Sequence, residues 1–240
     1  YMERVLKVAK ETSINRMMRC TTIMGRSEKD SLSTGQLFYP AMQCADIFKL
    51  DVDICQLGLD QRRVNMLARE IGPKLGWWKP VVVSHPMLMG LKPASSDSAA
   101  FDENASFNKQ IQMKMSKSKP ETCIYIHDTE EQIRAKIKNA YCPEKVVENN
   151  PILDYAKGLI FKKFDRFLIE RPEKFGGNLE VLDYAELEKL YVAGKIHPLD
   201  LKNSAAYYIN ELIRPAREHF EKNKKAAELY EIVKTQKITR

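Results

Sequence analysis

The run Lys114-Met115-Ser116-Lys117-Ser118 has the residue types and spacing that suit chemistry most clearly, because two ammonium groups alternate with two hydroxyls. Lysine supplies compact, mobile positive charge that can follow phosphate oxygens, while serine hydroxyls and nearby backbone amides fix the geometry. Taken alone, a short basic and serine-containing run is more often a solvated loop. It therefore indicates a polyphosphate site only if the surrounding sequence supports one.

The first 90 residues alternate between helix and strand patterns, which favours a parallel α/β sheet. Gly58 and Asp60 follow the first predicted strand, at the end where nucleotides settle in open α/β sheets. Pro40 is expected in the first turn of a helix, and Asp60 is also a candidate helix cap. The expected elements are helices at 2–20, from about 38 to 50 and at 61–71, and strands at 51–57 and 79–84.

The segment from Lys92 to Asn108 has small and polar residues without an apolar period, and it is expected to be a mobile surface loop. Because this loop leads directly into the lysine and serine run, the run is expected on a flexible arm. A lid that closes over a substrate would need that arrangement.

From Thr129 onward the pattern becomes helical. Thr129 with Gln132 forms a plausible capping box, and Asp183 with Glu186 repeats it. Pro198 is expected to begin another helix, which Pro215 kinks or ends. The chain is therefore predicted to divide into an α/β part, residues 1–127, and an all-α part, residues 128–240.

Composition narrows the class of protein. In 240 residues the hydrophobic content is 44% and the charged content 30%, and no run of eighteen apolar residues could span a membrane. The net charge of +7 suits a polyanionic partner such as RNA but equally suits simple solubility. Five scattered cysteines without a Cys-x-x-Cys pair argue against disulfides and structural zinc and favour a reducing compartment. Because the sequence opens in what reads as mid-helix, we expect a fragment.

Several motifs in a fixed order closely resemble the class I tyrosyl-tRNA synthetases of the archaeal and eukaryotic type. They are Tyr39–Asp46, Gly58–Arg63, Met66–Glu70, Lys114–Ser118, Ile133–Pro143, Val147–Pro151, Arg171–Gly177 and His197–Lys202. The resemblance covers nearly the whole chain, and only residues 92–112 look inserted. It implies the distal half of a Rossmann-like nucleotide-binding domain, followed by an all-α anticodon-binding domain.

The resemblance also implies an activity: ATP, with Mg²⁺ as its partner in the substrate, activates tyrosine to tyrosyl-adenylate, and tRNA(Tyr) then receives the tyrosyl group. It implies neither a resident metal nor a tightly bound cofactor. Tyr39, Gln43, Asp46 and Gln61 match positions that line the tyrosine pocket. Gln43 and Asp46 lie three residues apart, so they share one helical face. Taken singly, Tyr39, Gln43 or Gln61 would be ordinary helix surface or part of a buried hydrogen bond.

For the nucleotide, the resemblance assigns Lys114 and Lys117 to catalysis on the pyrophosphate side of the transition state. Positioning and charge neutralisation would supply the rate, without a general base. The remaining ATP-binding positions that it implies are Gly58, Asp60, Met115, Ser116 and Ser118.

The implied RNA contacts fall into two groups. Arg19, Arg62 and Arg63 resemble positions that meet the acceptor stem, although exposed helix charge explains them equally well. The second group reads the first anticodon base and consists of Phe175, His197 and Asp200. An aromatic plate and a carboxylate suit an unpaired base. Otherwise Phe175 would be core and Asp200 a favourable charge in a first helical turn.

The sequence also departs from the family. It has no His-x-Gly-His signature, and Asn65 and Leu57 replace a frequent His and a Gly. The chain is therefore expected to need a missing N-terminal segment or partner chain that carries the signature. Two alternatives stay open: a non-catalytic half that binds tRNA or another partner, and tryptophanyl-tRNA synthetase. The resemblance further implies a homodimer or pseudo-dimer, a cytoplasmic location and no membrane.

Overall fold

The computed structural model describes residues 1–24, 31–92, 113, 115 and 120–236. These residues form two compact units, each with its own hydrophobic core. We call residues 1–87 the N-terminal unit, and residues 88–92, 113, 115 and 120–236 the C-terminal unit. The division follows packing and lies earlier in the chain than the predicted boundary between 127 and 128, which concerns function and stays a prediction.

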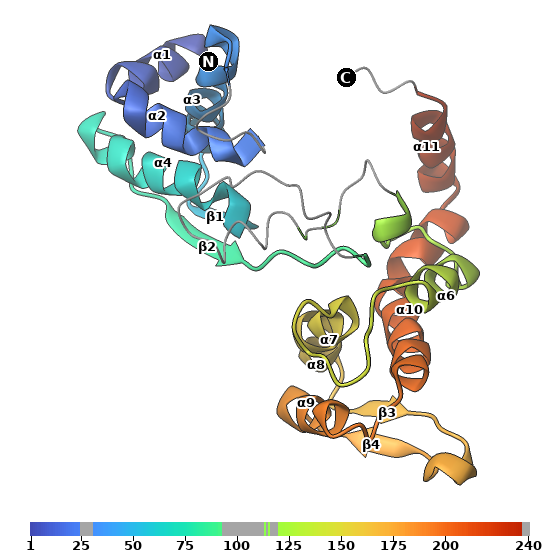
Figure 1. Ribbon diagram of the computed structural model, residues 1–240. Helices are drawn as coiled ribbons and strands as arrows, with labels where there is room; N and C mark the ends of the chain where they lie inside the picture. The colour runs from blue at the N-terminus through green and yellow to red at the C-terminus, as the bar shows by residue number, and fades with distance from the viewer. Residues whose placement is uncertain (25–30, 93–112, 114, 116–119, 237–240) are drawn as a thin grey trace. The chain divides into compact units, whose positions relative to one another are not determined.

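The N-terminal unit packs helices against a small parallel sheet (Figure 1). Strands β1 and β2 pair in parallel from Ile54 with Val81 to Gly58 with His85. The parallel sheet confirms the predicted α/β class. The elements are α1 (Met2–Lys10), α2 (Ile14–Cys20), a 3₁₀ turn (Thr21–Met24), α3 (Thr34–Lys49), β1 (Ile54–Gly58), a second 3₁₀ turn (Leu59–Gln61), α4 (Arg62–Lys74) and β2 (Val81–His85).

Three details of this unit differ from the sequence prediction. The first predicted helix is two helices, because the Thr12 hydroxyl bonds the Val8 carbonyl and Ser13 then caps α2. Helix α3 begins at Thr34, four residues early, since Ser33 and Gln36 form a capping box that the prediction missed. Pro40 therefore lies inside α3 rather than in its first turn. Helix α4 begins at Arg62 and its N-cap is Gln61, so the prediction that Asp60 caps this helix is wrong.

The C-terminal unit is mainly helical (Figure 1), as predicted, but it is not all-α. Two three-residue strands pair in antiparallel register, Phe167 opposite Val181 and Ile169 opposite Leu179. The elements are a 3₁₀ turn (Pro120–Thr122), α6 (Glu130–Lys138), α7 (Pro151–Tyr155), a π-helical turn (Ala156–Ile160), α8 (Phe161–Lys163), β3 (Phe167–Ile169), a 3₁₀ turn (Glu173–Phe175), β4 (Leu179–Val181), α9 (Tyr184–Val192), α10 (Pro198–Lys222) and α11 (Lys224–Thr235).

The longest helix, α10, organises this unit. It begins at Pro198 as predicted and continues through Pro215 to Lys222, so Pro215 does not start a new helix. The predicted capping box of Thr129 and Gln132 is present at the start of α6. Asp183 accepts from the Glu186 amide at the start of α9, but the Glu186 carboxylate returns to the Leu182 amide instead.

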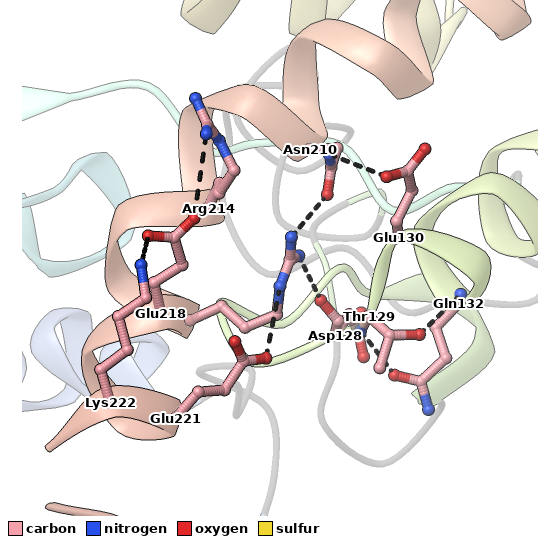
Figure 2. A network of polar contacts seen from close by, with 10 residues as sticks. Asp128, Thr129, Glu130, Gln132, Asn210, Arg214, Glu218, Glu221 and Lys222 are labelled. Carbon is pink, nitrogen blue, oxygen red and sulfur yellow. Dashed lines mark hydrogen bonds and ion pairs between the residues drawn. The ribbon is translucent and has the colours of Figure 1, made fainter.

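A polar network joins α10 to the start of α6 (Figure 2). Arg217 donates to the Asp128 carbonyl oxygen at 2.9 Å and to Oδ1 of Asn210 at 2.9 Å. The Asp128 carboxylate is itself held by Nζ of Lys136 at 2.6 Å. Asp128 and Asn210 are both about 4% exposed, so Arg217 supplies hydrogen bonds that water cannot easily replace.

We predict that Arg217→Ala lowers the free energy of unfolding by about 2 kcal/mol, because buried acceptors on Asn210 and Asp128 lose their donor. Urea denaturation followed by circular dichroism measures the change. Arg214→Ala is the matched control: that arginine is half-exposed on the same helix, and its loss should cost no more than about 0.5 kcal/mol. Equal losses in the two variants would contradict a special role for Arg217.

Candidate functional site

Helix α3 presents three of the predicted tyrosine-binding residues on one face. Tyr39, Gln43 and Asp46 are spaced i, i+4 and i+7 and line a pocket of about 560 Å³ in the N-terminal unit, which we call the α3 pocket. The opposite face of the helix is buried, through Ala41, Cys44, Ala45 and Phe48. The apolar face thus fixes which way the polar face points, and the predicted sharing of a face by Gln43 and Asp46 is confirmed.

Asp46 already accepts a phenol. The hydroxyl of Tyr1 donates to Oδ1 of Asp46 at 2.5 Å and lies 3.1 Å from the Met42 carbonyl oxygen. Burial, together with the hydrogen bond and the charge of Asp46, raises the pKa of Tyr1 to about 12, so the hydroxyl keeps its proton. The sequence predicted no role for Tyr1, because no motif or spacing around this residue indicated one.

Gln61, at the end of the 3₁₀ turn that follows β1, forms a hydrogen bond with Gln43. Nε2 of Gln43 donates to Oε1 of Gln61 at 3.0 Å, and Gln61 in turn donates to the Ile23 carbonyl oxygen. The structure thus joins all four predicted tyrosine-binding residues to one region, with Gln61 acting on the pocket through Gln43. A chain of amides can present both donors and acceptors to an amino acid.

Gly58 and Asp60 stand where β1 ends. A Cβ atom at Gly58 would lie 2.6 Å from Oδ1 of Asp60 and 3.0 Å from Sδ of Met87, so a larger residue there would force these side chains to move. Both residues therefore lie at the carboxyl edge of the parallel sheet, as expected for a nucleotide site. Their contact with ATP stays a prediction.

Of the lysine and serine run, only Met115 belongs to the described residues; Lys114, Ser116, Lys117 and Ser118 lie outside them, as does most of the predicted 92–112 insertion. Met115 donates its amide to the Leu88 carbonyl oxygen at 3.3 Å, and its side chain packs on the core of the C-terminal unit. The methionine thus has an anchoring role, and its predicted contact with ATP stays untested.

The predicted acceptor-stem arginines come together in part. Nη1 of Arg63 donates to the Arg19 carbonyl oxygen at 2.6 Å, so Arg63 also ties α4 to the end of α2. Arg19 and Arg62 are exposed. Contact of these three side chains with RNA stays a prediction.

The three predicted anticodon residues line one pocket of about 410 Å³ in the C-terminal unit, which we call the base pocket. Phe175 is 62% exposed, so the alternative interpretation of this residue as part of the core is wrong. His197 caps α10, its Nδ1 accepting from the Leu199 amide at 3.1 Å. In the neutral ring Nε2 then carries the proton and can donate. Asp200 is half-buried in the first turn of α10, which also suits the helix dipole.

Arg171 holds the walls of the base pocket, a role that sequence reasoning missed. It donates to the Gly177 carbonyl oxygen at 2.9 Å and to the Lys195 carbonyl oxygen at 2.7 Å. Gly176 follows Phe175 with φ of +96°, a conformation that favours glycine and turns the chain beside the aromatic plate. The Arg171-Pro172 motif by itself did not predict these hydrogen bonds.

Within the ranges that the structure describes, no group of three or more His, Cys, Asp and Glu side chains could hold a metal ion. All five cysteines are buried and free, and burial raises the pKa of the Cys44 thiol to about 12. None of the described helices is long and apolar enough to cross a membrane.

Comparison with known proteins fits this arrangement. The family model described as tRNA synthetases class I (W and Y) matches residues 1–214. The chain belongs to this family.

Relatives of this class I family are similar along the whole chain. Tyrosine–tRNA ligase 1, cytoplasmic, of Arabidopsis thaliana is 42% identical over 100% of this chain and 58% of its own length. The tyrosine–tRNA ligase of Saccharolobus solfataricus is 43% identical over 100% and 65%. The crystal structure of tyrosyl-tRNA synthetase complexed with L-tyrosine from Pyrococcus horikoshii superposes with a TM-score of 0.84 at 39% identity, covering 95% of this chain and 64% of that one. The chain thus spans about three fifths of these relatives.

We predict that Asp46→Asn lowers the pKa of Tyr1 from about 12 part of the way toward its ordinary value of 10.0. The variant removes the charged acceptor and its repulsion of the phenolate, while burial remains. Titration of the tyrosine ring carbons by NMR gives the value. Asp51→Asn, at an exposed neighbouring carboxylate, should leave it unchanged. An unaltered pKa in Asp46→Asn would show that the contact with Tyr1 is absent in solution.

Proposed function

We propose that this chain provides the distal half of a tyrosine–tRNA ligase. Such an enzyme activates tyrosine with ATP and Mg²⁺ and transfers the tyrosyl group to tRNA(Tyr). The observation that carries the proposal is the α3 pocket, where a carboxylate accepts a phenol hydroxyl beside the amides of Gln43 and Gln61.

The chemistry of Asp46 favours tyrosine over its rivals. A carboxylate has about four acceptor positions, so Asp46 can accept a substrate phenol as well as Tyr1. Phenylalanine has no hydroxyl, so it would cover the half-buried Asp46 without donating to it, at a cost of about 1 kcal/mol. Tyr39, Gln43 and Gln61 then meet the ammonium end. Tryptophan activation is the less favoured alternative, because the full-length similarity is to proteins named as tyrosine ligases.

In the adenylation step, the tyrosine carboxylate attacks the α-phosphate of ATP and pyrophosphate leaves. Lys114 and Lys117 neutralise charge on the departing pyrophosphate, and Met115, Ser116 and Ser118 are further proposed contacts of ATP. The remaining proposed contacts of ATP are Gly58 and Asp60, at the carboxyl edge of β1 and β2. No proton needs to be removed from the attacking carboxylate, so electrostatic positioning carries the rate.

We infer that a further segment or a partner chain, bearing the His-x-Gly-His signature, completes the site. The parallel sheet is only two-stranded within the described ranges, and Ile54, Val81 and Val83 are 62%, 53% and 47% exposed. Parallel sheets normally bury both faces, and two strands alone are marginal. Further strands beside β1 and β2 would cover these side chains.

The base pocket supports binding of tRNA(Tyr). Phe175 offers an exposed ring on which an unpaired base can stack, Nε2 of His197 can donate, and Asp200 can accept from the edge of the base. Arg19, Arg62 and Arg63 would meet the acceptor stem through its phosphates. These arginines lie on α2 and α4, in the same unit as the α3 pocket.

One observation favours the second candidate, a non-catalytic half that binds tRNA or another partner. Both side-chain polar atoms of Asn65, which replaces a frequent His, are buried and have no hydrogen-bond partner among the residues that the structure describes. A buried amide without hydrogen bonds lowers the stability of the fold, which is not expected at an optimised catalytic site.

By analogy with the Arabidopsis relative's name we infer a cytoplasmic location, and a homodimer or pseudo-dimer is part of the same proposal.

We predict that two variants separate the two halves of the reaction. Lys117→Ala should slow tyrosine-dependent pyrophosphate exchange about 100-fold or more, because one charge on the leaving group is lost. Asp200→Ala should leave exchange intact and weaken binding of tRNA(Tyr) roughly 10-fold or more, because one charged hydrogen bond to the base is lost. Both are measured on this chain supplemented with the segment that carries the His-x-Gly-His signature.

The matched control is Asp183→Ala, which removes a carboxylate from the N-cap of another helix in the same unit. It should affect neither exchange nor tRNA binding. Equal damage to both steps by Asp200→Ala would indicate a folding defect and contradict its role in reading the base. An unchanged exchange rate in Lys117→Ala would contradict the role of the lysines.

A further inference from the structure

A second pocket is lined by the same helix, α10, as the base pocket. Asp200, Asn203, Ser204 and Tyr207 are spaced i, i+3, i+4 and i+7, so they form one stripe on the helix. Asp200 lines the base pocket, and the other three line a separate polar pocket of about 350 Å³, which we call the flanking pocket. From Asp200 to Tyr207 the helix rises about 10 Å. Stacked bases lie about 3.4 Å apart, so this length can hold a base and its neighbour.

Strand β3 forms the other wall of the flanking pocket, and β3 lies beside the N-terminal end of α10 (Figure 1). Phe167 and Ile169 point into the core, so Arg166, Leu168 and Glu170 share the outward face of the strand. The Leu168 amide donates to the Tyr208 hydroxyl at 2.9 Å, which joins this strand to α10. The wall is therefore preformed rather than dependent on a ligand.

The side chains around the flanking pocket are mixed in kind. Arg166 and Arg134 supply positive charge, Glu170 and Asn203 supply acceptors, and Tyr207 supplies an aromatic ring that is 51% exposed. A free polyphosphate would be repelled by the Glu170 carboxylate and would leave the ring unused. A ribonucleotide in a strand matches all of them, because it has a phosphate, a 2′-hydroxyl that both donates and accepts, and a base with a π-face.

Both arginines are available to a phosphate. Arg166 pairs with Glu180 at 3.1 Å, and its side chain is 67% exposed. Arg134 pairs with Glu130 at 2.7 Å, with both side chains about half exposed. Exposed ion pairs of this kind are worth about 0–1 kcal/mol, so a phosphate oxygen can replace either carboxylate at small cost.

We propose that the flanking pocket binds the nucleotide next to the base held by Phe175, His197 and Asp200. The base of that nucleotide stacks on Tyr207, its phosphate contacts Arg166, and Arg134 adds positive charge beside it. Asn203 and Glu170 meet the ribose hydroxyl and the edge of the base. This inference rests on the proposed function, since it needs an RNA loop in the base pocket.

Fluorescence anisotropy with a labelled anticodon stem-loop of tRNA(Tyr) tests the proposal on the full chain. Tyr207→Ala should weaken binding about five-fold or more, through loss of one base–aromatic stack, while Tyr207→Phe should bind like the unaltered chain. One of the two bases next to the first anticodon position stacks on Tyr207 in this proposal. In a stem-loop that lacks that base, Tyr207→Ala should have no further effect. Both neighbours of that position are tested in turn.

Salt dependence tests the phosphate contact. Arg166→Ala should reduce the slope of log affinity against log salt by about 0.7, the value for one phosphate contact on a single strand. Arg214→Ala removes a half-exposed, ion-paired arginine elsewhere on the same unit and should leave the slope unchanged.

The outcomes separate this inference from the proposed function. If Asp200→Ala weakens binding while Tyr207→Ala and Arg166→Ala bind like the unaltered chain, the flanking pocket is not a nucleotide site and the proposed function stands. If Tyr207→Ala weakens a stem-loop equally with and without each neighbouring base, the stack is overturned. If the unaltered chain does not distinguish this stem-loop from one with a scrambled loop, the proposed tRNA recognition itself fails, and the inference with it.

Discussion

The register of α3 is the constraint on which the proposed tyrosine site depends. Ala41, Cys44, Ala45 and Phe48 are fully buried on one side of the helix. Small residues there let α3 pack closely on α1 and α4, and the polar face is left toward the pocket. A rotation of the helix by one residue, about 100°, would bury Asp46 without a partner, at a cost of several kcal/mol. Packing on one side therefore determines the chemistry on the other.

The same division between packing and chemistry recurs in α10. Leu201, Ala205 and Ile209 point into the core of the C-terminal unit, while the polar stripe that begins at Asp200 faces the two pockets. Further along, Arg217 fixes the helix to the segment before α6. One continuous helix thus carries the wall of the base pocket and is held in place many residues away from it. Its rigidity suits the proposed binding of an RNA loop.

Much of this arrangement could be predicted from the sequence where spacing and motif agree. The shared face of Gln43 and Asp46, the capping box at Thr129 and the grouping of Phe175, His197 and Asp200 all follow from helical period, cap residues or the family resemblance. What could not be predicted depends on contacts distant in sequence or on very short elements. Strands β3 and β4 have three residues each, which is too short for a period to show. The hydrogen bonds of Tyr1 to Asp46 and of Arg171 to Lys195 join residues far apart along the chain.

The most direct measurement of the central claim is exchange between ATP and pyrophosphate, with tyrosine, tryptophan or phenylalanine as the amino acid. It is made on this chain with and without the segment that carries the His-x-Gly-His signature. The account predicts exchange only with that segment present and only with tyrosine, because the substrate phenol donates a further hydrogen bond to Asp46. Exchange that depends on tryptophan, or the absence of tyrosine-dependent exchange from the completed protein, would contradict it.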